Sequence, residues 1–224
     1  MKYPILGRER RRPIALSAVG TVLVLAFACV LFTLTVLAIQ PGLLSDTLAA
    51  FWEDKLLIPL NIFPVCVVLI VCYCLTGNAF SAAGIGGLVV NLLSYINLVK
   101  TDCRNDPFVP ADCALLREAA NAVGDYQLDL HWGTLAAILL LSAVCFALAY
   151  WSRARKPRWY VRSIMALVVL TVFGASMVKV YPSGDIYDRR GVGTVKVSKS
   201  NVPEVFRLCG FPYCFLHNYN SVSY

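Results

Sequence analysis

Five long runs of apolar residues divide the chain, and shorter polar segments separate them. A helix needs about 20 mainly apolar residues to cross a hydrocarbon core roughly 30 Å thick, and each run approaches or exceeds that length. The pattern predicts an all-α membrane protein whose five transmembrane helices form a bundle. The predicted spans are 14–39, 56–75, 79–99, 132–151 and 163–180.

The second and third runs are separated only by Thr76, Gly77 and Asn78, which predicts a helical hairpin. Pro59 and Pro64 near the start of the second run predict a kink, and the carbonyl groups that they free must find partners within the protein. The third run carries small residues on one face, which favours close helix packing. These residues are Ala82, Ala83, Gly84, Gly86 and Gly87.

The basic residues give the spans a direction. Half of the 20 lysines and arginines lie before the first run or between the fourth and fifth, and basic flanks stay on the cytoplasmic side. We therefore expect a basic cytoplasmic N-terminus at 1–13, a five-span membrane domain at 14–180 and an extracellular linker at 181–224. The protein is predicted to be a multi-pass protein of the cell membrane with its C-terminus outside.

Composition supports a membrane protein and excludes several other classes. The chain is 58% hydrophobic and only 15% charged. It has too few polar residues to form the surface of a soluble globular protein. The net charge of +7 does not indicate nucleic-acid binding, because the basic residues cluster beside apolar runs. No acidic residue lies within a run, which disfavours an ion-coupled transporter. The only histidines, His131 and His217, are far apart, so we expect no metal site, and the chain has no catalytic motif or cofactor motif.

The densest polar segment follows the third run. Lys100 and Arg104 are expected at headgroup depth, where they would contact the phosphate of an anionic, phosphatidylglycerol-like lipid. The alternative is a solvated loop followed by a short helix, for which Asp112 after Pro110 would be the N-cap. An apolar face after Asp112 predicts an interfacial helix between spans three and four. The residues expected to shape the loop are Asn97, Asp106, Pro107, Pro110, Asp112 and Glu118.

The nine cysteines fall into two groups. Five lie inside apolar runs and are interpreted as small membrane-embedded residues. The other four lie in segments expected outside, where an oxidising environment permits disulfides between Cys103 and Cys113 and between Cys209 and Cys214. Free thiols are the competing interpretation.

Three motifs together suggest a family: Asn61-x-x-Pro64, Leu75-Thr76-Gly77-Asn78, and the loop from Asn97 to Ala119. They resemble the membrane domain of lipoteichoic acid synthase-like proteins, which are sulfatase-fold phosphoglycerol transferases. The tail around Gly210 and Phe211 looks like the linker that precedes the outer domain in that family.

The resemblance implies five spans with the N-terminus inside, followed by an extracellular catalytic domain that lies beyond Tyr224. In the family this domain uses a threonine nucleophile and a divalent metal, usually manganese, to transfer glycerol phosphate from phosphatidylglycerol during cell-envelope polymer synthesis. No catalytic residue can be assigned in this chain, and by itself it is expected to be inactive. The rival interpretation is a non-catalytic membrane scaffold or partner-binding protein, including a truncated gene product. Oligomeric state stays open.

Overall fold

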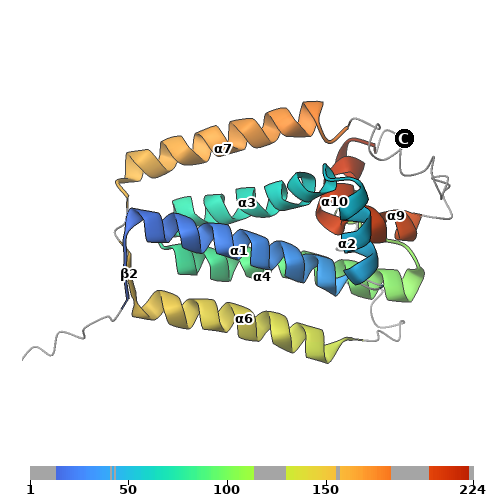
Figure 1. The fold of residues 1–224 in the computed structure, drawn as a ribbon, viewed down its shortest axis with the longest axis horizontal. Helices are drawn as coiled ribbons and strands as arrows, with labels where there is room; N and C mark the ends of the chain where they lie inside the picture. The colour runs from blue at the N-terminus through green and yellow to red at the C-terminus, as the bar shows by residue number, and fades with distance from the viewer. Residues whose placement is uncertain are drawn as a thin grey trace, which may run out of the picture.

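Five long helices run side by side in the structure (Figure 1), a computed structural model that describes residues 14–40, 42, 44–113, 130–154, 157–182 and 202–221. All five are long and apolar enough to cross a membrane, which confirms the five predicted helices and indicates a membrane-embedded, multi-pass protein. They are α1 (Ala18–Ile39), α3 (Leu57–Thr76), α4 (Ala79–Arg104), α6 (Trp132–Trp151) and α7 (Trp159–Lys179).

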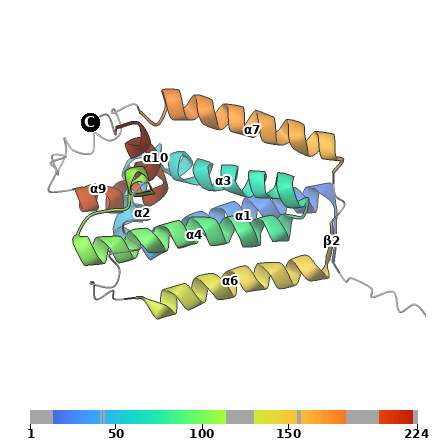
Figure 2. The ribbon, with the colours of Figure 1, turned by 180° about the vertical axis from the view of Figure 1, so that it is seen from behind.

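Short elements occupy the two ends of the bundle (Figure 2). At one end, strands β1 (Ile14–Leu16) and β2 (Ser152–Ala154) form a parallel pair. The opposite end, which we call the capped end, holds four short helices. They are α2 (Leu44–Glu53), the 3₁₀ helix η1 (Pro110–Cys113), α9 (Val202–Cys209) and α10 (Phe211–Ser221).

Helix α4 lies among α1, α3 and α6, and its glycines let all three approach. A Cβ atom added to Gly87 would overlap the ring of Phe32 in α1. One added to Gly86 would lie 2.9 Å from Leu69 Cδ2 in α3, and one added to Gly84 would lie 3.1 Å from the ring of Phe146 in α6. The predicted small-residue face is therefore buried, because it forms the contact surface of the central helix.

Helix α7 stands at the edge of the bundle beside α3 (Figure 1). None of its residues is buried, and Phe173 meets Phe63 of α3 with ring centroids 6.2 Å apart. Its exposed leucines and valines would face lipid chains in a bilayer. In that solvent, exposed apolar surface carries no penalty.

The observed helices differ from the predicted spans at their ends. α4 continues past 99 to Arg104, so Lys100 and Asp102 lie in its last turns. The helix ends at Asn105, which has a positive φ of 50°. α7 begins at Trp159, earlier than the predicted 163, since aromatic and basic residues continue the helix toward the interface.

The described part of the tail is docked on the capped end. Asn61 of α3 is completely buried, and its Nδ2 donates to Leu57 O at 2.9 Å and to Cys209 O at 2.8 Å. The Oδ1 atom of Asn61 accepts from the backbone N–H of Tyr213 at 3.2 Å. One amide in a spanning helix thus satisfies backbone groups of both α9 and α10, which makes these helices part of the packed structure.

Candidate functional site

The loop that follows α4 is organised around one lysine. Lys100 Nζ lies 2.8 Å from Asp106 Oδ2, 2.7 Å from Asp112 Oδ2 and 2.9 Å from the carbonyl oxygen of Pro107. An ammonium group has three hydrogens to donate, so these three acceptors engage all of them. The Lys100 side chain is 16% exposed and Asp112 is 24% exposed, whereas Asp106 is 61% exposed. The Lys100–Asp112 pair is consequently the more shielded of the two.

A tight reversal at Asn105 brings these residues together. Asn105 adopts a left-handed conformation, and its N–H donates to Thr101 O at 2.7 Å, which caps α4. The chain then returns along the last turns of the helix. There the buried Asn97 accepts a hydrogen bond of 2.8 Å from the backbone N–H of Phe108. The loop is therefore held both by the ion pairs of Lys100 and by the hydrogen bond between Asn97 and Phe108.

Asp112 closes the loop from its far side. Its Oδ2 also accepts from the N–H of Val109 at 2.8 Å, and its own N–H donates to Val109 O at 3.0 Å. Pro110 begins η1, in which Asp112 lies. The side chain thus caps the turn before it. The predicted interfacial helix and Glu118 lie outside the described residues.

One ring contact joins the loop to the tail, and one ion pair joins the end of α4 to the residue before α6. The ring of Phe108 stacks on Phe215 of α10 with centroids 5.7 Å apart, which ties the loop to the docked tail. Asp102 Oδ2 lies 2.7 Å from His131 Nε2 at the start of α6.

Arg104 occupies the last turn of α4 and is exposed at the capped end. Lys100 is turned into the loop and would have to give up a present acceptor to reach a lipid phosphate. The two residues predicted to act together thus have different surroundings. The headgroup contact itself stays a prediction for both.

All nine cysteines are free thiols in the structure. Cys103 and Cys113 are exposed, while Cys209 and Cys214 are buried where α9 meets α10. Burial, together with a hydrogen bond to Cys209, raises the pKa of the Cys214 thiol well above its usual value. This thiol is therefore held in its unreactive protonated form. The two disulfides stay predictions.

No group of three or more metal-binding side chains occurs within the described residues. No protein-family model, curated protein or solved structure matches this chain. Sequence reasoning identified Asn61 only as part of a motif, and it did not single out Gln40 or Tyr181. The signal for Asn61 and Gln40 was a polar side chain within or directly after an apolar run.

Proposed function

We propose that this chain is the membrane-anchoring, lipid-facing domain of a lipoteichoic acid synthase-like phosphoglycerol transferase that acts in cell-envelope polymer synthesis. The observation that supports this most is that the loop after α4 is held in one conformation by hydrogen bonds between its own residues. Motif residues that the resemblance rests on, Asn97, Lys100, Asp106, Pro107 and Asp112, contact one another or the backbone between them. A motif that folds into a defined unit at one end of a membrane bundle suits a lipid-facing role.

In this proposal the capped end is extracellular and the N-terminus is cytoplasmic. Arg104 presents its guanidinium group to the phosphate of an anionic lipid such as phosphatidylglycerol, a pairing favoured by charge-assisted, bidentate hydrogen bonds. Lys100 holds the loop that directly follows Arg104. Glycerol phosphate transfer would belong to a manganese-dependent, sulfatase-like domain of the full-length protein.

Lipid retention tests the lipid-facing role. The chain is placed in nanodiscs of mixed phosphatidylcholine and phosphatidylglycerol, and the lipids retained on release are identified by native mass spectrometry. Arg104→Ala should reduce retained phosphatidylglycerol about threefold to tenfold, as expected for loss of one charge-assisted contact. Arg158→Ala is the matched control, because Arg158 is an exposed arginine at the other end of the bundle. Equal effects of the two variants would refute a specific headgroup contact.

The rival is a non-catalytic membrane scaffold or partner-binding protein. The two differ in what the complete gene encodes and does. A reading frame that continues past Tyr224 into a sulfatase-like domain, with manganese-dependent glycerol phosphate transfer by the full product, would support the enzyme. A natural stop codon, with no transfer activity when the chain is co-expressed with its genetic neighbours, would favour the scaffold.

A further inference from the structure

An apolar groove of about 400 Å³ lies on the surface of the bundle, where α2 passes over α1 and α3. Eight of the nine residues that line it are apolar, and the ninth, Thr33, donates its hydroxyl hydrogen to Cys29 O at 2.8 Å within α1. The groove is open at the surface, because five of its lining side chains are at least 40% exposed. These five are Val30, Leu34, Leu48, Trp52 and Ile58.

Helix α2 connects α1 to α3 and runs crosswise to both (Figure 1). Since α1 and α3 are long and apolar enough to cross a membrane, a crosswise helix at their ends lies along the membrane surface. One side of α2 is packed on the protein: Thr47 is buried, and its Oγ1 donates to the carbonyl oxygen of Arg207 in α9 at 2.9 Å. The crosswise position is therefore fixed by the fold.

The rest of α2 has an apolar side and an acidic side. Leu48 and Trp52 are four residues apart, so they share the side that borders the groove. Asp46 and Glu53 are seven residues apart and share a different side, on which the Asp46 carboxylate lies 3.6 Å from the guanidinium group of Arg207. An apolar side next to a charged side is typical of helices that lie in the membrane interface.

The tryptophans mark the same level of the bundle. The chain has four, and each is at least 55% exposed. Trp132 and Trp151 are the first and last residues of α6, whose 20 residues rise about 30 Å, the thickness of a hydrocarbon core. Trp159 begins α7 at the end opposite the capped end, and Trp52 lies in α2 at the capped end. Tryptophan is enriched where hydrocarbon meets headgroups, so Trp52 indicates that α2 lies at that boundary.

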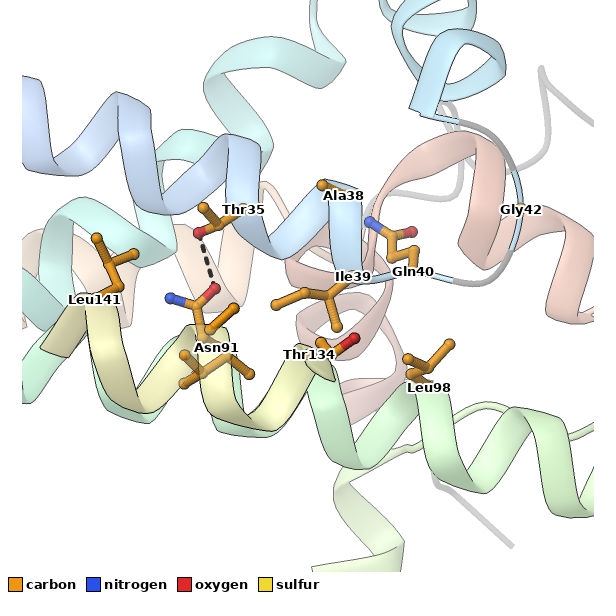
Figure 3. A pocket seen from close by; sticks show the side chains of 11 residues that line it. Thr35, Ala38, Ile39, Gln40, Gly42, Asn91, Leu98, Thr134 and Leu141 are labelled. Carbon is orange, nitrogen blue, oxygen red and sulfur yellow. Dashed lines mark hydrogen bonds between the residues drawn. The ribbon is translucent and has the colours of Figure 1, made fainter. Parts of the chain in front are cut away.

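A second cavity, between α1 and α6, has a different lining (Figure 3). It contains a polar pair in which Thr35 Oγ1 donates to Asn91 Oδ1 at 2.8 Å, and it is bordered by Gln40, which is 5% exposed. Among the described residues, those that line the groove beneath α2 include no such polar pair and no charged side chain. A hydrocarbon chain can therefore fill this groove without burying an unpaired polar group.

We propose that α2 is an interfacial helix that rests on the bilayer, and that one acyl chain of a phospholipid from the adjacent leaflet lies in the groove beneath it. The groove continues the exposed apolar surfaces of α1 and α3, which face lipid chains in a membrane. Contact with the acyl chain comes from three helices, and no headgroup contact is required. Phosphatidylcholine and phosphatidylglycerol therefore bind alike, and the inference does not rest on the proposed function.

Fluorescence quenching tests the position of α2. The other three tryptophans are replaced by phenylalanine, and the full chain, with Trp52 as its single tryptophan, is placed in phosphatidylcholine nanodiscs. Lipid brominated near its ester groups should quench Trp52 about twofold more than lipid brominated near its chain ends, because an interfacial helix is buried only about 5–10 Å into the boundary region. Iodide in the aqueous phase should quench Trp52 weakly.

The matched control moves the tryptophan by one residue, to the acidic side of α2. All four native tryptophans are replaced by phenylalanine and Glu53→Trp is added, after which iodide should quench at least about twofold more than it quenches Trp52. Equal iodide quenching at the two positions would show that α2 does not lie in the interface. Shielding of Trp52 from both iodide and brominated lipid would show that protein covers this side. Either result would overturn the proposal.

Lipid retention tests the groove itself. Leu34→Trp places a large ring in the groove from an exposed position of α1, and Val30→Trp does so one turn earlier. In native mass spectrometry, each variant should retain a phospholipid about fourfold less often, a loss equal to the contact of about one buried methylene group, whether the nanodisc lipid is phosphatidylcholine or phosphatidylglycerol. Val168→Trp is the control, because Val168 is exposed on α7, outside the groove. Retention that neither groove variant lowers, or that the control lowers equally, would overturn the proposal.

Discussion

The hydroxyl group of Tyr181 donates a hydrogen bond of 2.9 Å to the carbonyl oxygen of Leu60. Pro64 explains why that carbonyl is available: it lies four residues further along α3, inside the helix, and has no N–H to donate. Tyr181 follows the end of α7 and is completely buried. One hydrogen bond therefore compensates for a proline in one spanning helix and fixes the exit of another.

Replacing Tyr181 with phenylalanine should lower the free energy of unfolding by about 1–3 kcal/mol, because the Leu60 carbonyl would be buried without this partner. The measurement is reversible unfolding in mixed micelles. Tyr160→Phe is the control, since its hydroxyl lies on an exposed surface and meets Arg158. A loss of stability as large in the control would show that the Leu60 contact is not the cause.

Alkaline pH should destabilise the protein through Tyr181. Burial raises the pKa of this phenol above its ordinary value, so the folded protein retains the proton that the unfolded chain releases near pH 10. The associated stability is fully present below about pH 10 and is lost as the pH rises from there toward the folded pKa. Unfolding free energy measured across this range should fall more steeply for the unaltered protein than for Tyr181→Phe. Parallel curves would contradict the assignment.

Docking of the tail should depend on Asn61. Asn61→Leu keeps the approximate size of the side chain but leaves the Cys209 carbonyl and the Tyr213 N–H without their partner, at a cost on the order of 2–4 kcal/mol. Hydrogen exchange should therefore accelerate in α9 and α10 before it does in α4. Asn218→Ala is the control, because the bond of that amide among the described residues is to Cys214 O, within α10 itself. Unchanged exchange in α9 and α10 of the Asn61 variant would contradict this coupling.

The five spans could be predicted from the sequence because the bilayer sets both their length and their composition. The contacts that fix the capped end could not, since they join residues far apart in the chain: 121 positions separate Leu60 from Tyr181, and 152 separate Asn61 from Tyr213. A proline and an asparagine in an apolar run indicate that partners are needed. They do not indicate which partners.

In the candidate site, too, the sequence did not indicate which residues are in contact, although these residues are close together in the chain. Charge and position alone indicated that Lys100 faces lipid. Its actual direction depends on the left-handed turn at Asn105, which returns Asp106 and Asp112 to its side. Asparagine tolerates that conformation, but it is common in other conformations as well. For Gln40 the local signal, a polar side chain directly after an apolar run, does not indicate burial, because an amide after a spanning helix normally meets water.

Close packing of α4 should make Gly87 intolerant of a side chain. In Gly87→Ala the added methyl group would overlap the Phe32 ring, and overpacking of this kind costs about 1–3 kcal/mol. Gly174→Ala in α7 is the matched control, because nothing lies within 4 Å of the position where its Cβ would be. That variant should be neutral or slightly more stable in thermal unfolding. Similar melting temperatures for the two variants would contradict the central position of α4.

Removal of the Lys100 charge should release the loop while the bundle stays folded. Lys100→Met retains the aliphatic part of the side chain but leaves Asp106 and Asp112 to repel each other across the space that the ammonium group fills. Exchange of the Phe108 and Val109 amide hydrogens, which bond to Asn97 and Asp112, should accelerate about tenfold.

Asp102→Asn is the control for this experiment, because Asp102 pairs with His131, and among the described residues no ion pair joins it to Lys100. Its loop amides should exchange at the unaltered rate. If Lys100 instead turned outward to bind lipid phosphate, Lys100→Met would leave both loop amides protected and would lower phosphatidylglycerol retention as strongly as Arg104→Ala. The two measurements made together therefore decide whether Lys100 holds the loop or the lipid.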